Sequence, residues 1–204
     1  MMEKTFDDVV GFHGHLCLDI AMGYRIAKAA VREMGSELKN MKEVVAMVEN
    51  ETCAVDAIQE YTGCTLGKRN LTMTATGKPV YLLQNTKTQN AVRLYCHYWE
   101  TFDPDGSHSA RRKAMTGPGA TPEQKEAFQK ELNEKIQEIL TLPEEKLFRV
   151  KKIKLPPPPK VGKYKAKPCG NCGEYTHEGR FKEIDGKKVC ISCYEAALER
   201  KKWT

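Results

Sequence analysis

Two histidines and a cysteine lie within five residues near the start of the chain, in Gly11-Phe12-His13-Gly14-His15-Leu16-Cys17. An imidazole binds a metal or carries a proton, and a thiolate is a metal ligand or a nucleophile. Cys17 directly precedes a helical pattern over residues 18–34, and the free backbone N–H groups of a helix start favour a thiolate. The stretch therefore predicts one wall of a metal or ligand pocket.

A second predicted helix, over residues 53–60, carries further candidate groups. Cys53 lies in its first turn, and Asp56 lies three residues on, on the same side of the helix. Gly63 is a stop signal, and Cys64 follows it directly. Cysteines at helix ends suit a pocket better than cysteines in the middle of an element.

Thiolates combined with imidazole suit zinc, nickel, copper or iron, and fewer than four firm ligands leave a position for a substrate. A carboxylate beside them orients an imidazole or moves a proton. The competing explanation is that free cysteines fill a core, which we prefer for Cys96 inside a strand-like run. The candidate catalytic residues of this pocket are His15, Cys17, Cys53, Asp56 and Cys64, with His13 as an alternative ligand.

The elements that must position these groups can be predicted from periodicity. Residues 18–34 have apolar side chains at helical spacing, and Thr121-Pro122-Glu123 begins another helix that runs through Leu140. Apolar runs predict strands over residues 44–49 and 147–154, and an antiparallel meander over residues 71–76, 80–84 and 91–98. A short basic helix is predicted over residues 107–115. We therefore expect an α+β domain over residues 1–154, with an antiparallel sheet packed against helices.

A second cluster of cysteines lies near the end of the chain. The pairs Cys169/Cys172 and Cys190/Cys193 are separated by 17 residues, a spacing typical of a structural zinc site with four thiolates. A hairpin turning at Asp185-Gly186 and a helix after the second pair complete the order of a treble-clef zinc finger over residues 169–204. The alternative, two disulfides, is disfavoured in a cytoplasmic chain.

Composition separates the two halves. From Lys151 onward 14 Lys and Arg face 6 Asp and Glu, a net +8, whereas residues 1–150 carry 19 against 21, a net −2. Four consecutive prolines mark residues 155–168 as a stiff cationic linker. Any attraction to nucleic acid belongs to the basic tail, although a lysine-rich linker also serves solubility alone.

The chain has the composition of a globular protein, with 40% hydrophobic and 29% charged residues. Its start lacks the apolar run of a signal peptide, and no window approaches a membrane span. We expect a cytoplasmic protein that makes no membrane contact, with its eight cysteines as thiols or metal ligands.

Three stretches together resemble the family of the E subunit of formylmethanofuran dehydrogenase. They are His13-Gly14-His15-Leu16-Cys17, Cys53 to Gln59, and Thr62-Gly63-Cys64-Thr65-Leu66-Gly67-Lys68. The resemblance implies an α+β domain, a His/Cys pocket, a homodimer and an association with molybdenum or tungsten enzymes. Many members also look to carry a C-terminal zinc finger like this one.

The chain departs from the family pattern at two places. Leu18-Asp19 follow the first cysteine where the family usually has Pro-Gly, which puts a carboxylate near the thiol. Ala75-Thr76 precede Gly77-Lys78 where the family tends to have Asp-Tyr. An enzymatic role that used that carboxylate and phenol is therefore not expected of this chain.

Two functions from different classes follow. The first is a metal-binding protein with a structural zinc, a second transition metal in the N-terminal pocket, and a molybdenum or tungsten enzyme as partner. The second is a ligand-sensing regulator whose zinc finger and basic linker contact nucleic acid or a protein. A zinc module used only for docking or dimerisation is a third hypothesis.

Overall fold

The computed structural model describes residues 4–74, 76–158 and 165–201, and the chain divides into two units, Met1–Pro158 and Pro159–Thr204. Ala75 of the second family departure lies outside the described residues, as do residues 159–164 of the predicted linker. Within the described residues no helix combines the length and the apolar character needed to cross a bilayer.

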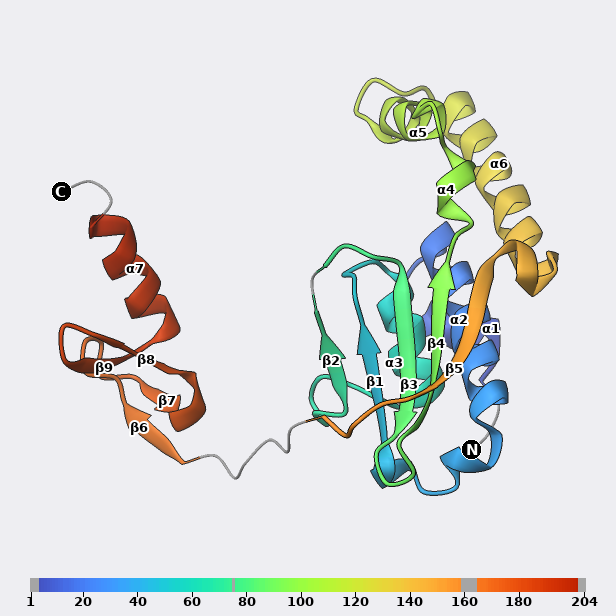
Figure 1. Ribbon diagram of the computed structural model, residues 1–204. Coiled ribbons are helices and arrows are strands. Elements are labelled where there is room, and N and C mark those ends of the chain that lie inside the picture. The colour runs from blue at the N-terminus through green and yellow to red at the C-terminus, as the bar shows by residue number, and fades with distance from the viewer. Residues whose placement is uncertain (1–3, 75, 159–164, 202–204) are drawn as a thin grey trace. The chain divides into compact units, whose positions relative to one another are not determined.

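The first unit contains helices and a five-stranded sheet (Figure 1). Its helices are α1 (Phe6–His13), α2 (Leu18–Met34), α3 (Ala54–Thr62), α4 (Trp99–Phe102), α5 (Ser107–Thr116) and α6 (Pro122–Thr141). Its strands are β1 (Val44–Val48), β2 (Leu71–Met73), β3 (Val80–Asn85), β4 (Asn90–Cys96) and β5 (Phe148–Lys154). Short 3-10 turns lie at η1 (Gly35–Leu38), η2 (Met41–Glu43) and η3 (Glu144–Lys146).

The sheet has the strand order β2-β1-β3-β4-β5, and the α+β class is confirmed. β3, β4 and β5 are antiparallel neighbours, but β2 pairs with β1 in parallel, with Ala46 opposite Leu71. The predicted meander is therefore wrong for β2, and the sheet is mixed. The chain passes through α3 between β1 and β2, and a helical crossover delivers two strands in the same direction.

Helices α1, α2 and α3 cover one face of the sheet (Figure 1). The core between them contains fully buried side chains from α2, including Ile20, Met22 and Ile26, and from the sheet, including Leu83 and Leu94. This burial agrees with the helical spacing of apolar residues in the sequence. Burying such side chains contributes about 1.5–3 kcal/mol each, so the core fixes where α2 begins.

Helix α6 packs back on α2 and so holds α4 and α5 near the start of α2. Its predicted start is confirmed, because Thr121 and Gln124 form a capping box with Pro122 in the first turn. At its other end Arg25 of α2 donates hydrogen bonds to the carbonyls of Ile139 and Leu142, at 2.6 and 2.8 Å. A cation at a helix C-terminus is favourable.

The second unit follows the predicted order of knuckle, hairpin, knuckle and helix. It contains β6 (Ala166–Pro168), β7 (Tyr175–His177), η4 (Glu178–Arg180), β8 (Phe181–Ile184), β9 (Lys187–Cys190) and α7 (Ile191–Lys201). The hairpin turns at Asp185 and Gly186, both with positive φ, as a two-residue turn requires. β6 pairs with β7 and lies inside the stretch predicted as linker.

Helices α2 and α3 approach unusually closely at Gly23. A Cβ added there would lie 2.6 Å from the Cα and 2.7 Å from the carbonyl oxygen of Ala54, closer than real Cβ atoms come. Ala54 is the first residue of α3, so this contact also fixes the position of Cys53.

We expect Gly23→Ala to lower the free energy of unfolding of the first unit by about 1–3 kcal/mol, because the backbone of α3 must move away. Gly11→Ala is the matched control. Gly11 lies inside α1 with no atom within 4 Å of an added Cβ, so alanine there keeps stability or raises it by up to about 1 kcal/mol. Urea unfolding followed by circular dichroism measures both, and equal effects would contradict the close-contact explanation.

Candidate metal centre

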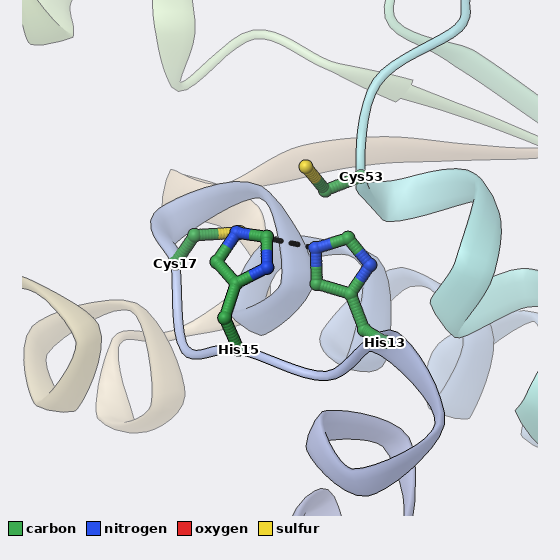
Figure 2. Close-up of side chains that lie close together, drawn as sticks. All are labelled: His13, His15, Cys17 and Cys53. Atoms are coloured by element: carbon green, nitrogen blue, oxygen red, sulfur yellow. Dashed lines mark hydrogen bonds between the residues drawn. The ribbon is translucent and has the colours of Figure 1, made fainter.

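Four side chains with metal-binding atoms meet at one place in the first unit. They are His13, His15, Cys17 and Cys53, and one ligand atom from each lies within 4.8 Å of the others. Figure 2 shows them converging from the loop between α1 and α2 and from the start of α3. Two thiols and two imidazoles are a donor set that fits zinc and related transition metals.

The chain places these groups with helix ends. α1 ends at His13, and Gly14 turns the chain with a φ of 89°, a conformation that glycine adopts without strain. Cys17 is the N-cap of α2 and accepts a hydrogen bond from the Ile20 N–H at 3.4 Å. Cys53 is the N-cap of α3 and makes no side-chain capping bond, so its sulfur is available to the cluster.

His13 is held by Asp56. The Nδ1 of His13 lies 2.8 Å from the Asp56 carboxylate, and its Nε2 lies 3.9 Å from the Cys17 sulfur. A carboxylate that accepts a proton from Nδ1 leaves the Nε2 lone pair facing the cluster, as in carboxylate–histidine–metal sites. The His13 side chain is only 9% exposed, whereas His15 is exposed.

Burial dominates the electrostatics of Cys17. Loss of solvent raises the pKa of this thiol to about 12, the Ile20 N–H opposes the shift, and the nearby Cys53 adds to it. The helix start was expected to favour the thiolate, and that expectation is wrong in direction because burial outweighs the single N–H. A positive ion beside the sulfur offsets this penalty, so metal binding would be accompanied by proton release.

Cys64, predicted as part of the pocket, lies elsewhere. It follows the C-terminal end of α3, and nine residues of helix separate it from Cys53, about 14 Å at 1.5 Å per residue. Its side chain is fully buried, and its sulfur points to the carbonyl of Val44 at 3.9 Å. Burial raises the pKa of the Cys64 thiol, as it does for a core residue.

Cys96 is fully buried in β4, in agreement with its assignment to the core. Burial raises the pKa of the Cys96 thiol to about 12.

A cavity of about 660 Å³ opens beside the cluster. His15, Cys17 and Cys53 line one side, and side chains of α4, α5 and α6 line the rest. The sequence alone did not indicate this second wall, and His108 was expected to be a surface or partly buried residue. No local motif marks the wall, because its residues come together only when α6 folds back on α2. Its principal members are Trp99, Phe102, His108, Arg112 and Phe128.

The second unit has its own cluster, formed by Cys169, Cys172, Cys190 and Cys193, with ligand atoms within 4.8 Å of one another. Backbone N–H groups of Cys172 and Cys190 lower the pKa of the Cys169 thiol to about 6. Four thiols arranged in this way fit a structural metal site.

The fold and the sites together define an α+β domain with a mixed His/Cys cluster, joined to a small four-cysteine unit. The family described as "FmdE, Molybdenum formylmethanofuran dehydrogenase operon" matches residues 12–149, more than half of the chain. The chain belongs to this family.

Two relatives extend the comparison. A "Probable S-adenosyl-L-methionine-binding protein" of Archaeoglobus fulgidus is 29% identical over 191 residues, which cover 89% of this chain and 50% of the relative. The chain thus spans about half the length of this curated relative. The crystal structure of an FmdE-like protein of tungsten formylmethanofuran dehydrogenase from Syntrophus aciditrophicus has the same fold, with a TM-score of 0.59 at 22% identity, covering 94% of this chain and 90% of that one.

If both clusters bind metal, the full chain loaded with zinc and then dialysed retains two ions per chain. We expect Cys53→Ser to retain one, because one thiolate of the N-terminal cluster is lost, and Cys64→Ala to retain both. Plasma mass spectrometry of the dialysed samples measures the ratio of zinc to protein. Equal losses in the two variants would contradict the separation of Cys64 from the cluster.

Proposed function

We propose that the N-terminal unit binds one transition metal ion through His13, Cys17 and Cys53, with His15 as a fourth, exchangeable ligand facing the cavity. The observation that carries this proposal is the hydrogen bond from His13 Nδ1 to Asp56, which leaves Nε2 facing the two sulfurs. A histidine whose second nitrogen is held by a carboxylate is typical of metal sites.

The two imidazoles are supported unequally. Asp56 orients the nearly buried His13, whereas the exposed His15 lines the cavity and has no hydrogen bond among the described residues. The ring of His15 packs against that of His13, with centroids 4.3 Å apart. A ligand in the cavity can therefore displace His15 at a smaller cost than His13.

The metal supplies electrostatic polarisation to a group bound next to it. The chain's own residues hold that group: the aromatic side chains of α4 and α6 exclude water, and Asp56 keeps His13 in one tautomer. Zinc is the first ion to test, because two thiolates and two imidazoles match its preferred ligands.

A second proposal concerns the small molecule. The Archaeoglobus relative is described as a probable S-adenosyl-L-methionine-binding protein, and its alignment includes most of this chain. A cavity of about 660 Å³ lies within the range of pockets for ligands of this size. We propose that S-adenosylmethionine or a close analogue binds there.

The remaining expectations stay predictions. They are a structural zinc in the second unit, a homodimer, an association with a molybdenum or tungsten enzyme, and a cytoplasmic location. Contact of the basic second unit with nucleic acid or a protein is also a prediction, and Tyr175, whose side chain is 76% exposed, is a candidate contact residue.

His13→Ala and His15→Ala each remove one imidazole and test the unequal roles. We expect His13→Ala to weaken zinc binding at the N-terminal cluster at least tenfold more than His15→Ala, because only His13 is oriented by a carboxylate. Competition with a chromophoric chelator measures the affinity of the full chain, in which the four-cysteine cluster is unchanged. A larger loss in His15→Ala would contradict the assignment.

Binding of S-adenosylmethionine to the zinc-loaded chain can be measured by isothermal titration calorimetry. We expect Phe102→Ala to weaken binding about tenfold or more, since this ring lines the cavity. Phe12→Ala is the control, because Phe12 is an exposed aromatic residue of α1 and does not line the cavity. Failure of the wild-type chain to bind would refute the second proposal and leave the metal site standing.

A further inference from the structure

The cavity beside the metal cluster contains two carboxylates with different surroundings. Asp103 is fully engaged in local structure: its oxygens accept hydrogen bonds from the backbone N–H groups of His108 and Ser109 and from the Ser109 hydroxyl, at 2.6–3.0 Å. Asp103 therefore holds the start of α5. Its hydrogen-bonding capacity is already used by the protein.

Asp19 is the other carboxylate of the cavity wall, and it is partly buried in the first turn of α2. Within the described part of the chain its carboxylate makes no hydrogen bond or ion pair. Burial raises the pKa of this carboxyl, while the charges of Arg112 and His13 lower it. A partly buried carboxylate without a partner is costly unless something else satisfies it.

An aromatic wall lies in the same cavity. The rings of Trp99 and Phe102 meet edge to face with centroids 5.3 Å apart, Phe102 and His108 are 4.9 Å apart, and His108 and Phe128 are 5.9 Å apart. Phe128 is 7% exposed. Aromatic faces combined with a carboxylate are the usual surroundings of an organic cation.

The metal cluster does not oppose a cation. Two thiolates carry as much negative charge as a divalent ion carries positive charge, so a loaded site of two cysteines and two histidines is neutral overall. Arg112 and Lys125 line the cavity with exposed side chains. Among the described residues Arg112 makes no hydrogen bond or ion pair, so its guanidinium can hold an anionic group of the same ligand.

We propose that the cavity recognises a small zwitterionic ligand, with a sulfonium or ammonium cation held by Asp19 and the aromatic wall and a carboxylate held by Arg112. This inference rests on the proposed S-adenosylmethionine site and adds what that proposal lacks, the residue that reads the positive charge. Asp19 makes the cavity prefer the sulfonium form over a neutral sulfide of nearly the same shape.

The test compares S-adenosylmethionine with S-adenosylhomocysteine, which has a neutral sulfur, on the zinc-loaded full chain by isothermal titration calorimetry. The wild-type chain is expected to prefer S-adenosylmethionine about tenfold or more, and Asp19→Asn to lose most of that preference. Arg112→Gln weakens both ligands by similar factors, because both carry the carboxylate. Asp7→Asn, at an exposed aspartate of α1 outside the cavity lining, matches the charge change of Asp19→Asn and leaves both affinities unchanged.

Zinc content and thermal unfolding are measured on the same samples, so that loss of the metal or of the fold is recognised. If S-adenosylmethionine does not bind the wild-type chain, the proposed ligand and this inference both fail. If it binds but Asp19→Asn keeps the wild-type preference, the inference alone fails. An Asp19→Asn chain that retains zinc and folds normally, yet loses the preference, is the outcome that supports it.

Discussion

The crossing of α2 and α3 at Gly23 is the constraint on which the N-terminal site depends. Only a residue without a side chain lets the backbone of Ala54 approach so closely. This approach fixes the start of α3, and with it Cys53, next to the start of α2, where Cys17 is the N-cap. The two thiols are 36 residues apart in the sequence and meet because two helix starts are packed together.

The same helices provide the support for the site. Asp56 lies one turn into α3 and holds His13, which ends α1, so three helix ends are linked through one histidine. Helix α6, held to α2 by Arg25, forms the far wall of the cavity. The metal-binding atoms therefore lie on packed helix ends, whereas the side of the cavity formed by α4 and α5 is more exposed. This combination suits a fixed metal with an exchangeable ligand.

Much of this could be predicted from the sequence, and the failures have physical causes. The long helix after Cys17, the capped start of α6 and the two cysteine pairs depend on local spacing, which a sequence displays directly. Cys64 was misplaced because a residue directly after a helix lies at the opposite end from the first turn. The parallel pairing of β2 and the wall containing His108 depend on how distant segments pack. The pKa of Cys17 depends on burial, which a helix start does not reveal.

Anomalous X-ray diffraction from crystals of the zinc-loaded chain, recorded on both sides of the zinc absorption edge, tests the central claim most directly. The account predicts a peak between His13 Nε2 and the sulfurs of Cys17 and Cys53, in addition to a peak among the four cysteines of the second unit. A peak at the four cysteines alone, with His13 still hydrogen-bonded to Asp56 and no metal beside it, would contradict the account.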